Sequence, residues 1–235
     1  MQRVVLSCEH GGNRVPAAFA ASFRGAGRML ATHRGLDLGA FELARFLARR
    51  LAAPLHASTV TRLLVDLNRS PHNPRGMFSE LVADLPDEKR QAILRVHYHP
   101  YRRAVEAALR RAGTLARPAR HLSVHSFTPV WRGERRRVDV GLLFDPSRPL
   151  ERGFAHDWQD RLQHALPELR IRRNNPYRGT ADGFTVHLRR SLGARYVGIE
   201  IEVNQAIAAG PAGPRRALHR AVAETFGAAV AAAKG

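Results

Sequence analysis

Two histidines stand beside short apolar runs, at positions where a neutral imidazole could bind a metal ion. His10 follows the apolar run at 4–7 and precedes two glycines, which allow a tight turn and the close approach of a ligand. His125 follows a second apolar run at 121–124. Each histidine taken alone is better explained by hydrogen bonds in a turn or in the core, so only their combination with other residues suggests a metal site.

Carboxylates at two further places could support such a site. His33 and Asp37 are four residues apart before an expected helix, so they share one face of a helical turn. Asp37 could bind a metal or could simply complement the N-terminus of that helix. Glu200 and Glu202 alternate within an apolar run and therefore face the same side of a strand. One of them could act as a general base with a raised pKa, and the alternative is an exposed face of the sheet.

Asn68 and Arg69 follow the apolar run at 62–67. An arginine can hold a carboxylate through two parallel hydrogen bonds, and a neighbouring amide can add another. The flanking serine and proline are also typical of a solvent-facing turn. The stretch therefore predicts either a carboxylate clamp or an ordinary turn.

Runs with strand and helix periodicity alternate along the chain, which predicts an α/β sandwich with a mixed, largely parallel sheet. Strands are expected at 4–7, 55–60, 62–67, 121–124, 138–144 and 195–201. Helices are expected at 38–51, 87–112, 150–166 and 206–233, with a break or kink at His99-Pro100 in the second and a Gly-Pro interruption in the last. Active sites in such folds form at the carboxyl ends of the strands, where the polar residues described above would meet.

The length of 235 residues and the 44% share of hydrophobic residues predict one domain that spans residues 1–235. No apolar run approaches the roughly 20 residues of a membrane span, and the first residues do not resemble a signal peptide. A soluble, cytoplasmic protein without membrane partners is therefore expected. The lone cysteine, Cys8, excludes an internal disulfide and a cysteine-rich zinc site, so any zinc would be held by histidines and carboxylates.

The formal net charge of +18 invites a nucleic-acid partner, but the distribution of the charge argues against one. Only Lys89 and Lys234 are lysines among the 38 basic residues, and the arginines are spread along the chain as in proteins from GC-rich genomes. Dense clusters occur only at 135–137 and 170–173, without interleaved aromatic residues for base stacking. Nucleic-acid binding is therefore the least favoured function.

Seven segments, in this order, resemble the N-formylglutamate amidohydrolase family, which is related to zinc carboxypeptidases and aspartoacylases. They extend over nearly the whole chain and read SCEHGGNRVP, HRGLDLGA, VDLNRSPHNP, HYHPYRRAVEAAL, SVHSFTP, NNPYRGTADGFTVH and GIEIEVNQ. The resemblance implies a three-layer, phosphorylase/hydrolase-like α/β fold and a hydrolase that uses Zn²⁺ or another divalent metal.

In this resemblance, His10 and His125 correspond to two histidine ligands of the metal. The carboxypeptidase-like pattern His-x-x-Glu would place the next ligand at Asn13, which is a poor zinc ligand. Asp37 is preferred as the third ligand because the second segment of the family carries an acid there. The alternatives for the third ligand are Glu9, Asn13 and His33.

The resemblance also implies the remaining roles. Glu202 would be the general base that activates water, Asn68 and Arg69 would hold the substrate carboxylate, and Arg178, with Tyr177 beside it, would be a second carboxylate contact. The implied reaction is hydrolysis of a small anionic N-acyl amino acid, such as N-formyl-L-glutamate, to formate and glutamate. A zinc peptidase or another amide hydrolase on the same scaffold is the alternative. The acyl group, the native metal and the oligomeric state are left open.

Overall fold

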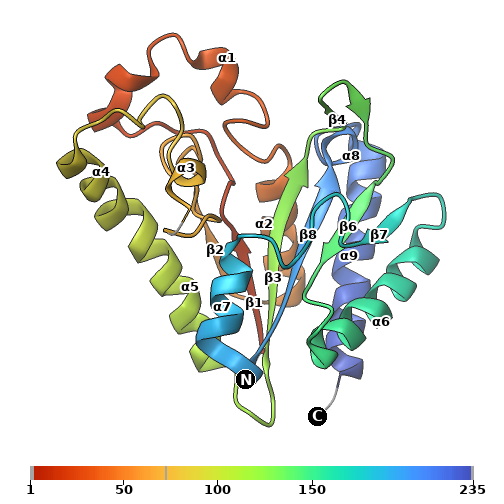
Figure 1. The fold of residues 1–235 in the computed structure, drawn as a ribbon. Coiled ribbons are helices and arrows are strands. Elements are labelled where there is room, and N and C mark those ends of the chain that lie inside the picture. Colours follow the sequence, from red (N-terminus) through yellow and green to blue (C-terminus); the bar gives the residue numbers. More distant parts are fainter. Residues whose placement is uncertain (1–2, 72, 234–235) are drawn as a thin grey trace.

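A six-stranded sheet forms the centre of the molecule (Figure 1). The computed structural model describes residues 3–71 and 73–233 of the chain. In the order in which they pair, the strands are β2 (Leu55–Ala57), β1 (Val4–Cys8), β3 (Ala119–Phe127), β8 (Tyr196–Asn204), β6 (Val140–Leu143) and β7 (Ile171–Arg173). The first four are parallel to one another, and β6 and β7 run antiparallel to them. The sheet is therefore mixed and largely parallel, as the sequence predicts.

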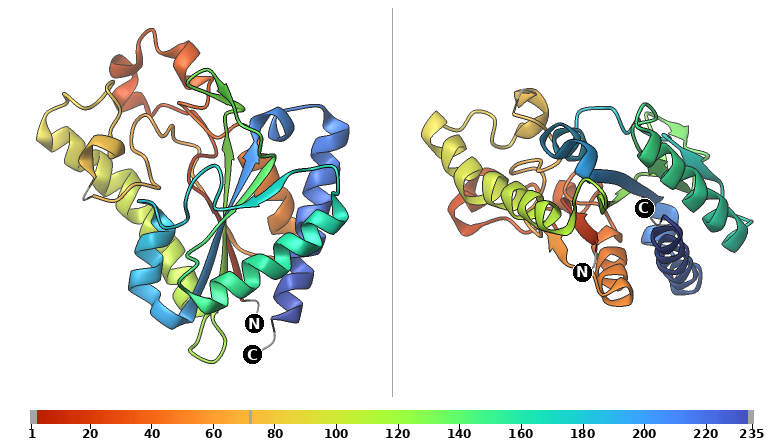
Figure 2. Two further views of the ribbon diagram at one scale, coloured as in Figure 1. Left: turned by 45° about the vertical axis from the view of Figure 1, so that its right-hand side comes forward. Right: turned by 90° about the horizontal axis from the view of Figure 1, so that it is seen from below.

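Helices cover both faces of the sheet (Figure 2). One face packs against α2 (Ala40–Leu51), α6 (Pro149–Ala165) and α9 (Ala212–Ala232), whose apolar side chains share a core with the strands. The short helix α8 (Gln205–Ala208) follows β8 directly. The other face packs against α5 (His99–Ala112) and α7 (Phe184–Leu192), which share a second apolar core with the strands. This arrangement confirms the expected three-layer α/β sandwich.

The two faces of the central strands differ in polarity because successive side chains in a strand point to opposite sides. In β3, Leu122 and Val124 join the core shared with α2 and α9, whereas His125 belongs to the opposite face. In β8, Ile201 joins that same core and the next residue, Glu202, does not. His125 lies directly opposite Glu202 in the register of the two strands. The alternating pattern thus brings two chemically active side chains together on a buried face.

Two segments, one before α2 and one between β2 and α5, build a smaller unit beyond the carboxyl ends of the parallel strands (Figure 1). It contains the 3-10 turn Ala17–Phe23 and the short helices α1 (Gly27–Leu30), α3 (Pro74–Met77) and α4 (Asp87–Ile93). An apolar core of its own holds this unit together, and its buried members include Phe23, Leu64, Met77, Ile93 and Tyr98.

The structure corrects two expectations about individual elements. Residues 62–67 form turns and not a strand, because their apolar side chains pack into the core of the smaller unit. The helical path at 87–112 is not broken at Pro100. A π-helical turn at Leu94–Tyr98 leads into α5, and the proline lies in the first turn of α5, where its missing N–H is tolerated.

Strands β3 and β8 continue to Phe127 and Asn204, so His125 and Glu202 lie within strands and not after them. Strand β7 and helix α7 were not expected, because arginines dominate the first and the second begins in a stretch of turn residues. None of the helices in the described part of the chain combines the length and the apolar character that a membrane crossing requires.

Candidate metal centre

Three buried side chains meet at the carboxyl ends of β1 and β3: His10, Asp37 and His125. His10 lies just after β1, Asp37 precedes α2, and His125 lies near the end of β3. Nδ1 of His10 is 3.3 Å and Nδ1 of His125 is 2.8 Å from Oδ2 of Asp37. One ligand atom from each residue lies within 4.8 Å of the other two. The three side chains thus direct potential metal-binding atoms toward one point.

Backbone contacts hold these segments together. The N–H of Asp37 donates to the carbonyl oxygen of His10 at 3.0 Å, which ties the turn before α2 to the end of β1. At Gly12 a Cβ atom would lie 2.6 Å from the carbonyl oxygen of Thr59, so only glycine permits this close approach. The glycines after His10 therefore have a steric cause, because they let the chain turn tightly against the loop that follows β2.

The outer nitrogens of both imidazoles face carboxylates. Nε2 of His10 is 2.8 Å from Oδ1 of Asp66, and Nε2 of His125 is 3.2 Å from Oε2 of Glu9. The hydroxyl of Ser123 donates to Glu9 at 2.7 Å and lies 2.9 Å from Nε2 of His125, from which it can accept. With the proton of a neutral imidazole held on Nε2 by these acceptors, Nδ1 would present its lone pair to a metal in place of the contact with Asp37.

This donor set fits a divalent metal. Imidazoles and carboxylates are ligands of catalytic zinc sites, and bond lengths of about 2.0–2.1 Å place neighbouring ligand atoms roughly 3.4 Å apart. The 3.3 Å separation between His10 and Asp37 matches that value, whereas the 2.8 Å separation between His125 and Asp37 is a hydrogen-bond distance. Burial alone raises the pKa of Asp37, but the charge of His10 and hydrogen bonds to both histidines hold it well below its usual range. Asp37 is therefore available as a negatively charged ligand.

The three alternative third ligands lie elsewhere. Glu9 contacts the second histidine on the side away from Nδ1. The amide of Asn13 donates to a backbone carbonyl of the smaller unit at 3.1 Å. His33 lines the same cavity as the three side chains, but it does not belong to the group whose ligand atoms converge. Of these four candidates, Asp37 is the one whose oxygen lies next to Nδ1 of both histidines.

His10, Asp37 and His125 line a cavity of about 500 Å³. Every residue to which the sequence assigns a role in the site lines this cavity: His10, Asp37, Asn68, Arg69, His125, Arg178 and Glu202. His125 lies in β3 and Glu202 in β8, and the other five lie in the loops that follow β1, β2 and β7. The structure thus brings all of them together, and their chemical roles stay predictions.

Glu202 is a buried carboxylate with an unpaired oxygen. The residue is 7% exposed, and its Oε2 has no hydrogen-bond partner within the described residues. Burial raises the pKa of Glu202 to about 8, while attraction to His125 opposes the shift and repulsion from Asp37 and Glu200 adds to it. Glu200 is equally buried, but its carboxylate accepts a hydrogen bond from Thr185. The exposed-face alternative for this pair is wrong, and Glu202 is the one suited to exchange a proton with a ligand.

Asn68, Arg69 and Arg178 form a polar wall of the cavity. Oδ1 of Asn68 accepts the N–H of Phe184, the first residue of α7, at 2.6 Å and so stabilises the start of that helix. Nη1 of Arg69 donates to the carbonyl oxygen of Asp182 at 2.8 Å. Arg178 reaches the cavity from the loop between β7 and α7. Two arginines from separate segments thus face one cavity, which suits an anionic ligand.

Arg62 and Asp66 also belong to the centre, although the sequence assigned them no role. Arg62 donates to Oδ1 of Asp37 at 3.1 Å and to Oδ2 of Asp66 at 2.6 Å, so it bridges the two carboxylates. One feature of the sequence could have indicated this role. Asp66 is an acidic residue inside the apolar run at 62–67, and a carboxylate that is buried with such a run requires a charged or hydrogen-bonding partner.

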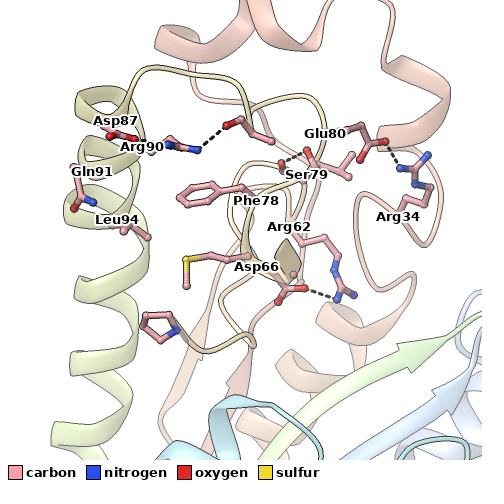
Figure 3. A pocket seen from close by; sticks show the side chains of 15 residues that line it. Arg34, Arg62, Asp66, Phe78, Ser79, Glu80, Asp87, Arg90, Gln91 and Leu94 are labelled. Atoms are coloured by element: carbon pink, nitrogen blue, oxygen red, sulfur yellow. Dashed lines mark hydrogen bonds and ion pairs between the residues drawn. The ribbon is translucent and has the colours of Figure 1, made fainter. Parts of the chain in front are cut away.

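A second cavity, of about 950 Å³, adjoins the first at Arg34, Arg62 and Leu63. Figure 3 shows the side chains that line this second cavity. Its apolar lining includes Phe78 and Leu94. Its arginines are paired with acids: Arg62 with Asp66, Arg34 with Glu80 and Arg90 with Asp87. Among the described residues that line it, no second group of metal-ligating side chains is found. We therefore assign the chemistry to the smaller cavity.

Comparisons with known proteins identify the family of this chain. A gene product of Agrobacterium tumefaciens of known structure is similar over 100% of this chain and 92% of its own, with 26% identity and a TM-score of 0.83. An N-formylglutamate amidohydrolase from Ralstonia eutropha JMP134 is similar over 97% of this chain and 93% of its own, with 19% identity and a TM-score of 0.68, and shares the fold. A search of curated protein sequences found no match. The sequence model of one family matches residues 2–209, and the chain therefore belongs to the N-formylglutamate amidohydrolase family.

Proposed function

We propose that this protein is a metal-dependent amidohydrolase that cleaves the amide bond of a small anionic N-acyl amino acid such as N-formyl-L-glutamate. The observation that carries the proposal is the buried set of His10, Asp37 and His125 beside the unpaired carboxylate oxygen of Glu202. The family, and the fold shared with the Ralstonia eutropha enzyme, support the same reaction. We propose Zn²⁺ as the metal, because histidines and carboxylates are ligands of catalytic zinc, and the cytoplasm as the location.

Each residue of the proposed metal centre would have a separate role in the reaction. A divalent metal held by the two histidines and Asp37 would supply Lewis-acid polarisation of the scissile carbonyl and of the attacking water. Glu202 would take a proton from that water, because its raised pKa of about 8 lies near the pH at which the protein would operate. The same carboxyl group would then give the proton to the nitrogen of the leaving amine. Asp66 and Glu9 would keep the imidazoles oriented.

Arg69 and Arg178 would select an anionic substrate. Both line the cavity, and arginine binds a carboxylate with two parallel hydrogen bonds. Asn68 adds an amide beside them. The net charge of +18 would also attract a dicarboxylate from solution. The products from N-formyl-L-glutamate would be formate and glutamate.

The test is formate release by purified protein from which metal has been removed with a chelator. Activity on N-formyl-L-glutamate should be lost on metal removal and should return when Zn²⁺ is added. N-acetyl-L-glutamate and short peptides in the same assay separate an amidohydrolase from a peptidase. Equal activity with and without metal, or no hydrolysis of any amide by zinc-loaded protein, would refute the proposal.

The variant Glu202→Gln supplies the matched control. It should retain Zn²⁺, because Glu202 is not among the proposed ligands, and should lose at least about 100-fold in turnover. Unchanged turnover would remove Glu202 from the mechanism.

A further inference from the structure

Two large aromatic side chains stand partly exposed at the cavity that bears the metal centre. Trp131 lies on the hairpin formed by β4 (Val130–Trp131) and β5 (Glu134–Arg135), and Tyr177 lies in the loop before α7. Both line the cavity, and Trp131 is 48% and Tyr177 42% exposed. Exposed rings at a cavity are favourable binding surfaces, because a ligand that covers them removes a large apolar area from water.

Arg136 holds these two rings in place. Its guanidinium carbon lies 5.4 Å from the ring centroid of Trp131 and 5.0 Å from that of Tyr177, and its Nη1 donates to the hydroxyl of Tyr177 at 2.9 Å. The same guanidinium lies 5.5 Å from the ring centroid of Phe127, which is buried at the end of β3. His33 packs edge-on against Trp131, with the ring centroids 6.3 Å apart. Because these contacts order the rings before a ligand arrives, binding loses less conformational entropy.

The cavity is larger than the simplest substrate of the proposed reaction. N-formyl-L-glutamate has about twelve non-hydrogen atoms, whereas cavities of about 300–1,000 Å³ commonly hold drug-sized ligands. This cavity, of about 500 Å³, lies within that range. Arg178 directly follows Tyr177 in the chain, and both line it. A carboxylate and an additional apolar group of one ligand could therefore be held at the same time.

We propose that Trp131 and Tyr177 form an aromatic rim that binds an aromatic ring of the substrate. The preferred substrate is then an N-acyl amino acid that carries, besides a carboxylate, an aromatic ring in its acyl group or in its side chain. This inference rests on the proposed amidohydrolase function and specifies its substrate class. Water adds across the amide C–N bond, and the products are the acyl carboxylic acid and the free amino acid.

Binding to the zinc-loaded Glu202→Gln variant tests the inference without turnover. N-benzoyl-L-glutamate carries a ring in its acyl group, N-formyl-L-phenylalanine carries one in its side chain, and N-formyl-L-glutamate has none. We expect at least one of the ring-bearing amides to bind about tenfold more tightly than N-formyl-L-glutamate. It should also change the tryptophan fluorescence through Trp131, because the only other tryptophan in the sequence, Trp158, is fully buried.

Trp131→Ala, added to the same variant, should remove this preference. The ratio of the affinity for the ring-bearing amide to the affinity for N-formyl-L-glutamate should then be close to one. Val130→Ala is the matched control, since Val130 is 49% exposed on the same hairpin but does not line the cavity, and it should keep the ratio. The inference is overturned if no ring-bearing amide binds more tightly than N-formyl-L-glutamate, or if Trp131→Ala weakens the binding of all three equally. A failure of the wild-type enzyme to hydrolyse any of them would instead refute the proposed function, because the comparison of affinities does not depend on turnover.

Discussion

Nε2 of His10 lies 2.8 Å from Oδ1 of Asp66, a contact that joins the end of β1 to the smaller unit. The two residues are 56 positions apart in the sequence, and both are buried. The contact occupies the imidazole nitrogen opposite the one that faces Asp37, so it selects the nitrogen of His10 that can bind a metal. The proposed metal centre therefore depends on a residue that would not itself be a ligand.

Asp66→Asn should weaken metal binding without abolishing it. The amide no longer holds the proton of His10 on Nε2 as firmly, and loss of such an outer carboxylate typically costs about 10- to 100-fold in metal affinity. The measurement is the Kd of Zn²⁺ by competition with a chromogenic chelator. Asp157→Asn, at a partly exposed acid that pairs with Arg161, is the control. An unchanged Kd in Asp66→Asn would show that His10 is oriented without this contact.

The activity should rise with pH as Glu202 loses its proton. Burial raises the pKa of Glu202 to about 8, and only the ionised carboxylate can take a proton from water. A bound divalent cation favours the ionised form, so the rising part of the pH profile of kcat/KM should lie below pH 8 in the metal-loaded enzyme. If the same rise persisted in Glu202→Gln, it would belong to another group.

Glu202 should also destabilise the metal-free fold at alkaline pH. Its pKa of about 8 in the folded state lies above the ordinary value of 4.5, so the folded state binds more protons between these two values. The contribution of Glu202 to stability is therefore present below pH 4.5 and declines as pH rises toward 8. At pH 8, the free energy of unfolding of Glu202→Gln should exceed that of the wild type by roughly 1–3 kcal/mol, so the variant should unfold at a higher temperature. Thermal unfolding of both proteins at acidic and alkaline pH measures this difference in stability. A difference that does not change with pH would contradict the prediction.

Arg178→Ala should raise KM for an anionic substrate more than it lowers kcat. A hydrogen bond to a charged group contributes about 1.5–3 kcal/mol, which corresponds to about 10- to 150-fold in affinity. Steady-state kinetics with N-formyl-L-glutamate measure the effect, and Arg161→Ala, at a partly exposed arginine outside the cavity, is the control. A decrease confined to kcat would instead place Arg178 in the chemical step.

Glu151 and Arg189 form a buried ion pair that anchors the loop carrying Arg178. Nε of Arg189 lies 3.1 and 2.9 Å from the two oxygens of Glu151, and its Nη1 donates to the carbonyl of Gly179 at 2.5 Å. Glu151→Ala leaves the charge of Arg189 buried with fewer partners, so the free energy of unfolding in urea should fall by about 3–5 kcal/mol. Glu151→Gln, which retains one acceptor, should lose less. If Glu151→Ala lowered the free energy of unfolding no more than a surface substitution does, the ion pair would not stabilise the fold.

The sequence by itself determined the periodic features of this protein. Alternation within β8 predicted that Glu200 and Glu202 share one face, and the order of strand and helix patterns predicted an α/β sandwich with a mixed, largely parallel sheet. Periodicity is a local property of the chain, so it can be read without knowledge of distant segments. It failed at 62–67, because an apolar run looks the same whether it pairs in a sheet or packs as turns into a separate core.

Only the tertiary structure decided which candidate could complete the metal centre. Asn13 is three residues from His10 but turns to a carbonyl of the smaller unit, whereas Asp37, 27 residues away, reaches Nδ1 of both histidines. Asp66, 56 residues from His10, occupies the outer nitrogen of that imidazole. These contacts join segments that are distant in the sequence, and their geometry depends on how β1, β3 and the smaller unit pack together. The sequence therefore showed which residues are candidate ligands, and the packing of distant segments determined which of their atoms lie close together.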